Sequence, residues 1–90
     1  MSKIQVEVLF FASAREAAGN LSSTELELQT GSNTSDLRKE MAEKFPKLAA
    51  MVLDEENLTL ALNEEYVASG DVKELKTGDT VALIPPISGG

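Results

Sequence analysis

The two ends of the chain carry the apolar segments that most constrain its fold. Apolar residues occupy every second position of 4–10, which is the pattern of a strand with one buried face. Leu9, Phe11 and Ala12 add apolar side chains on the other face, so this strand should end as a central strand. Residues 81–84 are apolar without interruption, which also suits a buried central position. Two central strands are expected to pair side by side.

The middle of the chain supplies one clear helix. Asn33 is a favourable N-cap, and the carboxylate of Asp36 lies three residues on, where it can reach back to the cap amide. Leu37, Met41 and Phe45 recur at every fourth position and form the apolar face. The charged residues of this helix are expected to face water: Arg38, Lys39, Glu40, Glu43 and Lys44.

The other segments complete a mixed α+β pattern. Pro46 ends the helix, and residues 48–53 form a short apolar segment, helical or irregular. Alternating patterns predict three further strands, which span 24–28, 58–62 and 66–67. A helix that covers one face of such a sheet gives an α+β roll of the β-grasp type. We therefore expect a mixed sheet of about five strands on one main helix, with a domain over 1–84 and an extended tail over 85–90.

Composition excludes several classes of function. A chain of 90 residues fits one domain, and its net charge of −7 repels a phosphate backbone, so nucleic acid is a poor partner. A partner protein with a basic groove fits better, although acidity alone also keeps a small protein soluble. The chain has no Cys and no His, so no metal site is expected and the usual side-chain nucleophile and base are missing. No signal peptide or membrane span is evident, which favours the cytosol.

The C-terminal tail carries the most specific signal. A rigid Pro85-Pro86 step favours an extended stalk, and the last two residues are Gly89 and Gly90. A terminal carboxylate becomes an electrophile only when it is activated, for instance as an acyl-adenylate. Glycine threads a narrow enzyme channel at low steric cost, and sulfur transfer would then give a nucleophilic thiocarboxylate. Gly90 is therefore the candidate reactive residue, as glycyl adenylate and then as 1-thioglycine.

The whole chain resembles the small, sulfur-carrying subunit of molybdopterin synthase, a ubiquitin-like β-grasp sulfur carrier. The resemblance rests on residues 8–12 with Arg15-Glu16, on Asp36-Leu37-Arg38, and on residues 60–63 with Tyr66-Val67. The most specific part is the end segment, residues 78–90, which reads GDTVALIPPISGG. The Gly-Asp turn alone is weak, because many ubiquitin-like folds share it.

The resemblance implies a place in molybdenum cofactor biosynthesis. An E1-like enzyme would adenylate Gly90 with ATP and magnesium, and a persulfide donor would supply sulfur. The tail would then enter the large subunit of molybdopterin synthase and give its sulfur to cyclic pyranopterin monophosphate. The family's synthase is a heterotetramer, and its catalytic residues belong to the large subunit. This chain would hold no permanent cofactor and would not be an enzyme by itself.

Several other residues are candidates for partner binding. Phe10 and Phe11 face opposite ways, so Phe10 is expected in the core, while Phe11 faces either the core or a partner. Arg15 either pairs with a partner carboxylate or is solvated. Ile87 is apolar on an exposed tail and is expected to dock in a partner groove. The remaining partner-binding candidates of the tail are Pro85, Pro86, Ser88 and Gly89.

Three alternatives stay open at this point. The chain could carry sulfur for another product, such as thiazole or thiolated tRNA. It could be a protein modifier that is attached to lysines through Gly90, as ubiquitin is. It could also be an interaction module whose tail has no chemical role.

Overall fold

The last strand of the chain lies in the middle of the sheet. The computed structural model describes residues 2–86, and its five-stranded sheet has the order β2-β1-β5-β3-β4. β1 and β5 run parallel, and every other neighbouring pair is antiparallel. The strands are β1 (Lys3–Phe10), β2 (Ser23–Gln29), β3 (Thr59–Leu62), β4 (Glu65–Val67) and β5 (Thr80–Ile84).

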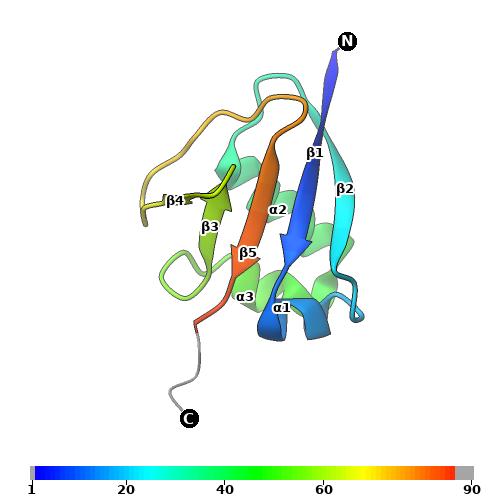
Figure 1. Cartoon of the computed structure of the whole chain (residues 1–90), viewed down its shortest axis with the longest axis vertical. Coiled ribbons are helices and arrows are strands. Elements are labelled where there is room, and N and C mark those ends of the chain that lie inside the picture. The colour runs from blue at the N-terminus through cyan, green and yellow to red at the C-terminus, as the bar shows by residue number, and fades with distance from the viewer. Residues whose placement is uncertain (1, 87–90) are drawn as a thin grey trace.

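The helices lie on one side of the sheet and at its lower end (Figure 1). They are α1 (Ala12–Ala17), α2 (Thr34–Lys44), the 3-10 turn η1 (Pro46–Leu48) and α3 (Ala49–Val52). The apolar segment at 48–53 is thus helical, and so is the stretch after β1. The β-grasp prediction is confirmed, including the side-by-side pairing of the first and last strands.

The main helix begins where its capping residues predict. Asn33 Oδ1 accepts a hydrogen bond from the Asp36 amide at 2.9 Å, and Asp36 Oδ2 accepts one from the Asn33 amide at 3.0 Å. This reciprocal capping box satisfies amides that the first helical turn would leave without partners. α2 ends at Lys44, just before the proline at position 46.

One layer of apolar side chains between sheet and helices forms the core. Alternate residues of β1, β2 and β5 enter it, together with Leu37 and Met41 of α2. Phe10 is buried as expected, and its ring meets that of Phe45 edge to face, with centroids 5.5 Å apart. Among residues 2–86, no helix is long and apolar enough to cross a membrane.

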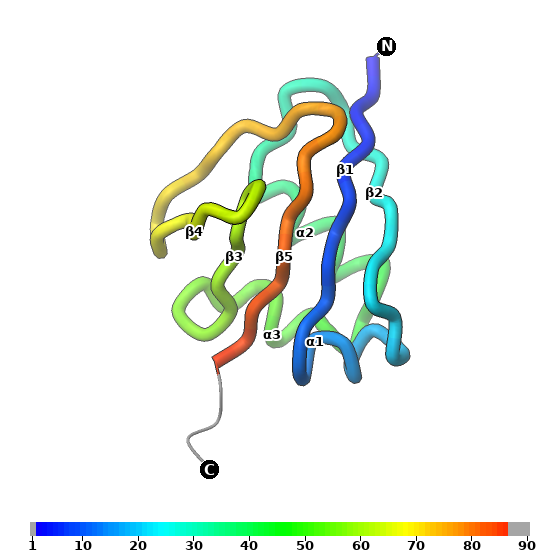
Figure 2. The backbone as a smooth tube through the Cα atoms, viewed as in Figure 1, coloured from blue at the N-terminus to red at the C-terminus, as the bar shows by residue number. Residues whose placement is uncertain are grey.

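A long connection carries the chain from β4 at one edge back to β5 at the centre. Residues 68–79 pass over the upper end of the sheet (Figure 2). The connection is tied to the start of α2, because the Thr34 amide donates to Lys73 O and the Leu75 amide donates to Ser32 O, each at 2.9 Å. The side chain of Leu75 is buried in the core, a role that its turn-rich surroundings in the sequence did not reveal.

The expectation that Arg38 faces water is wrong. Its side chain is only 8% exposed, and its guanidinium donates to Val52 O at 2.8 Å and to Leu58 O at 2.9 Å. Val52 ends α3 and Leu58 precedes β3, so one planar cation satisfies two carbonyls on either side of a turn. Burial lowers the pKa of Arg38, and the carboxylates of Glu55 and Asp54 act in the opposite direction. The Arg38 guanidinium nevertheless stays charged, because arginine is not deprotonated in proteins.

Replacing Arg38 should therefore weaken the whole fold. Arg38→Met keeps the apolar stem but leaves two buried carbonyls without donors, so we expect a loss of about 2–4 kcal/mol in the free energy of unfolding. Arg38→Lys should lose less, because an ammonium still reaches one carbonyl. Urea denaturation measures both changes. The exposed neighbour Lys39 provides the control, since Lys39→Met should change stability by no more than about 0.5 kcal/mol. An unchanged urea midpoint for Arg38→Met would contradict this role.

Candidate functional site

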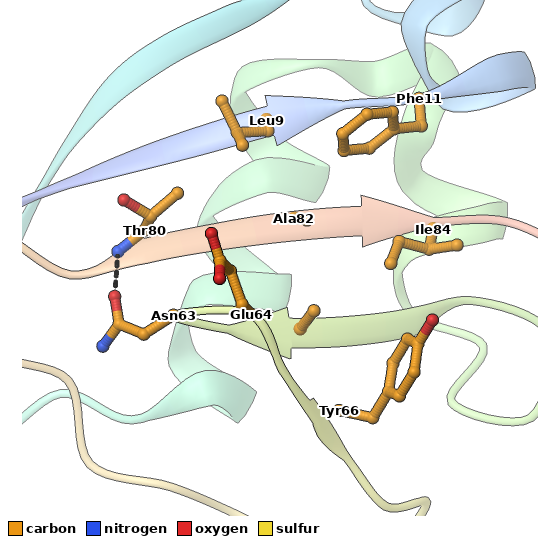
Figure 3. Close-up of a pocket in the computed structure, with 9 residues that line it drawn as sticks. Leu9, Phe11, Asn63, Glu64, Tyr66, Thr80, Ala82 and Ile84 are labelled. Carbon is orange, nitrogen blue, oxygen red and sulfur yellow. Dashed lines mark hydrogen bonds between the residues drawn. The ribbon is translucent and has the colours of Figure 1, made fainter.

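The face of the sheet opposite the main helix carries an apolar depression that runs along β5. Side chains from β1, β3, β4 and β5, and from the segments that follow β1 and β3, surround it (Figure 3). The lining residues are Leu9, Phe11, Ala61, Asn63, Glu64, Tyr66, Thr80, Ala82 and Ile84. Six of these nine are apolar or aromatic, so the depression is an exposed hydrophobic patch of the kind that binds other molecules.

Strand register explains the hollow shape. Leu9 pairs with Ala82, Ala82 with Ala61, and Ala61 with Tyr66, so one row of side chains crosses four strands. Two alanines form the low floor of this row, and the larger side chains of Leu9 and Tyr66 stand at its ends. Phe11 adds a second wall where β1 ends (Figure 3). Phe11 is 48% exposed and Tyr66 is 76% exposed, which is high for aromatic residues.

The expectation of a buried central position for residues 81–84 holds for the position of β5 in the sheet but not for burial of its second face. Both are interior strands of the sheet, but only their inward side chains are fully buried, such as Val81 and Leu83. Within the described part of the chain, no helix or strand covers the outer face of the sheet, and Leu9, Ala82 and Ile84 remain half-buried. Phe11 is exposed on this face, so it does not belong to the core.

A strained hairpin forms one rim of the depression. Asn63 and Glu64 connect β3 to β4, and both have positive φ, at 51° and 74°. A type I′ turn needs this geometry and usually places glycine second, so Glu64 is an unusual choice. Asn63 is held firmly: its Oδ1 accepts from the Thr80 amide at 2.9 Å, and its Nδ2 donates to Asp79 Oδ1 at 3.0 Å.

The tail begins beside the depression. Ile84 lines it, Pro85 is buried, and Pro86 is exposed. Pro85, the first residue of the expected tail, thus packs against the domain. The predictions for Ile87, Ser88, Gly89 and Gly90 lie outside the described residues.

Arg15 lies one helical turn from Phe11, and its amide donates to Phe11 O at 3.3 Å. Arg15 is exposed on α1 and does not line the depression. Conversely, sequence reasoning did not assign a role to Leu9, Glu64, Tyr66 or Ala82 as a group, because only strand register brings them together. Within the described part of the chain, no group of three or more His, Cys, Asp or Glu residues is placed to hold a metal ion.

Comparison with known proteins places this geometry in a family. The ThiS family matches residues 8–90. The molybdopterin synthase sulfur carrier subunit of Chlamydomonas reinhardtii is 42% identical over 87 residues, which is 97% of this chain and 100% of the relative. The human molybdopterin synthase sulfur carrier subunit is 39% identical over 87 residues, covering 96% of this chain and 94% of the relative.

Solved structures agree with this assignment. A putative molybdopterin converting factor subunit 1 from Pyrococcus furiosus has a TM-score of 0.79 at 34% identity, covering 93% of this chain and 99% of that one. SAMP1 from Haloferax volcanii gives 0.81 at 25% identity, with 96% and 99% covered. Subunits 1 and 2 of the molybdopterin-converting factor from Helicobacter pylori, solved as a complex, give 0.64 at 25% identity, with 97% and 100% covered.

The sheet, its helical layer and its open face define a ubiquitin-like β-grasp protein. More particularly, the chain belongs to the ThiS family and, within it, to the molybdopterin synthase sulfur carrier subunits.

The positive φ of Glu64 predicts a gain in stability when this residue becomes glycine. Glu64→Gly removes a side chain from a left-handed position, and the gain outweighs the extra flexibility of glycine in the unfolded chain. We expect the free energy of unfolding to rise by about 0.5–1 kcal/mol, measured by urea denaturation. Glu64→Gln, which keeps the strain, should match the wild type. A less stable Glu64→Gly protein would show that the turn is not strained at this residue.

Proposed function

We propose that this chain is the sulfur carrier subunit of a cytosolic molybdopterin synthase. Its Gly90 is adenylated, converted to a thiocarboxylate and delivered to a large subunit. There the sulfur passes to cyclic pyranopterin monophosphate in the synthesis of molybdopterin. The catalytic side chains belong to the large subunit, and the assembly is a heterotetramer.

The family match over nearly the whole chain carries the proposal. The relatives that match end to end are named as molybdopterin synthase sulfur carrier subunits. The Helicobacter pylori structure is named as a complex of subunits 1 and 2 of the molybdopterin-converting factor, which supports a large-subunit partner. The absence of Cys and His from this chain fits a carrier whose reactive group is its own terminus.

The chemistry requires three balanced steps. The Gly90 carboxylate attacks ATP on the E1-like enzyme and releases pyrophosphate, with magnesium bound to the phosphates. A persulfide then attacks the acyl-adenylate and releases AMP, which leaves an acyl disulfide. A thiol attacks the donor sulfur of this acyl disulfide. The terminal thiocarboxylate leaves on this chain, and a new disulfide joins the thiol to the sulfur donor.

The sheet gives this chemistry a rigid base. Ile84 pairs with Thr59 in the sheet, and Pro85 is buried. The segment that leads to Gly90 thus starts from a fixed point next to the apolar depression. A large subunit that covers the depression would receive the tail in one orientation, which lowers the entropy cost of placing the terminus in its active site.

A second function has one specific observation in its favour. SAMP1, a structural neighbour of this chain, is named in another solved structure as a small archaeal modifier protein. Attachment to lysines would use the same activated Gly90. Isopeptide-linked conjugates in cell extracts, mapped by mass spectrometry, would favour modification over sulfur transfer.

Coexpression with the cognate activating enzyme should produce the thiocarboxylate. We expect the intact mass to rise by the exchange of one oxygen for one sulfur. The modified protein, mixed with a large subunit and cyclic pyranopterin monophosphate, should then form molybdopterin. A mass gain without molybdopterin would favour a sulfur carrier for thiazole or tRNA.

A variant with one residue added after Gly90 is the matched control. It keeps the fold and the depression but moves the carboxylate beyond the correct depth, so both the mass gain and molybdopterin formation should disappear. If the extended protein works normally, the terminal carboxylate is not the reactive group.

Filling the depression should block docking without harming the fold. Ala82→Gln adds a polar side chain to the floor, away from the core, so binding to the large subunit in size-exclusion chromatography should be lost. Ala50 is exposed on α3, and Ala50→Gln should bind normally. Circular dichroism should give equal unfolding temperatures for both variants. Normal binding by Ala82→Gln would remove the depression from the proposed interface.

A further inference from the structure

One carboxylate, that of Glu64, lies at the rim of the apolar depression. In Figure 3, Glu64 extends from the hairpin toward β5, on the side of Thr80 and Ala82. Among residues 2–86 the one side-chain ion pair joins Lys3 to Glu27, so Glu64 has no cation of its own within the described chain. In the free protein, water solvates this carboxylate, because the residue is exposed.

The backbone holds the hairpin that carries this charge in place. Glu64 follows Asn63, which is bound to Thr80 and Asp79 of the neighbouring segment. The turn has two residues, and Leu62 pairs directly with Glu65, which leaves the hairpin little freedom to swing away. The point at which the Glu64 side chain leaves the hairpin therefore stays at the rim when another protein approaches.

Covering the depression removes water from Glu64. A carboxylate that loses its water without gaining a partner strongly opposes association. The next row of the same face adds to the negative potential, since Glu7 pairs with Thr80 and lies opposite Glu25. A surface that covers the floor of the depression must therefore place a cation against Glu64, and an arginine matches a carboxylate best.

We propose that Glu64 determines which protein can dock on the depression, by requiring an arginine or lysine on the docking surface of the large subunit. The inference rests on the proposed function, because it names the chemistry of that same partner. A protein with an apolar projection but no cation at this position would be excluded by the cost of burying an unpaired charge.

The test is direct binding of the purified large subunit, measured by isothermal titration calorimetry. Glu64→Gln should weaken binding by about tenfold, and Glu64→Lys by at least about a hundredfold. The neighbouring Glu65 is exposed on β4 and does not line the depression, so Glu65→Gln and Glu65→Lys are matched controls with the same charge changes. These controls should stay within about threefold of the wild type.

A charge exchange makes the test specific. Each Arg and Lys on the docking surface of the large subunit is changed singly to Glu, and one of these variants should restore binding to Glu64→Lys while weakening binding to the wild type. Raising the salt concentration should weaken wild-type binding more than binding by Glu64→Gln.

The outcomes separate the two proposals. If the wild type binds and Glu64→Lys binds equally well, the role of Glu64 is wrong and the proposed function stands. Equal losses for the Glu64 and Glu65 variants would also overturn it, since overall charge would then explain the effect. If the wild type does not bind the large subunit at all, the proposed function fails, and this inference fails with it.

Discussion

The insertion of β5 between β1 and β3 is the interaction on which the rest of the structure depends. It joins two antiparallel pairs into one sheet and gives the helices a continuous apolar surface to cover. It also sets the register that aligns Leu9, Ala82, Ala61 and Tyr66 in one row. Because β5 leads directly into the tail, the same pairing that completes the core places Ile84 and Pro85 at the edge of the open face.

The two faces of the sheet solve different physical problems. The inner face is packed with Val and Leu side chains that the helices of the same chain bury. The outer face leaves two aromatic rings and an acidic hairpin exposed, features that add little to the stability of an isolated domain. Glu64 in a left-handed conformation is unfavourable for folding alone. Such features are consistent with a surface shaped for association, where stability is exchanged for recognition.

The sequence predicts the fold well because local pattern and global topology agree. The alternation in β1, the capping box at Asn33 and the proline after α2 each correspond to an observed element. The misses have a common cause. Arg38 lies among the charged residues of α2, where the sequence pattern predicts exposure to solvent. The buried carbonyls that it binds come from the turn between α3 and β3, which the pattern of α2 does not show. Leu75 lies in an irregular connection without periodicity. An uninterrupted apolar strand, finally, does not reveal whether its second face is covered by the same chain or left open.

The central position of β5 also has a consequence for how the protein is made. Glu7 cannot pair with Thr80 until β5 has been synthesised, so β1 and β3 have no strand between them before that point of translation. A chain that stops before Thr80 leaves two unpaired edges, which favours aggregation or degradation over folding. Completion of the sheet therefore acts as a length check, because a molecule reaches the native state only after the base of its tail has left the ribosome.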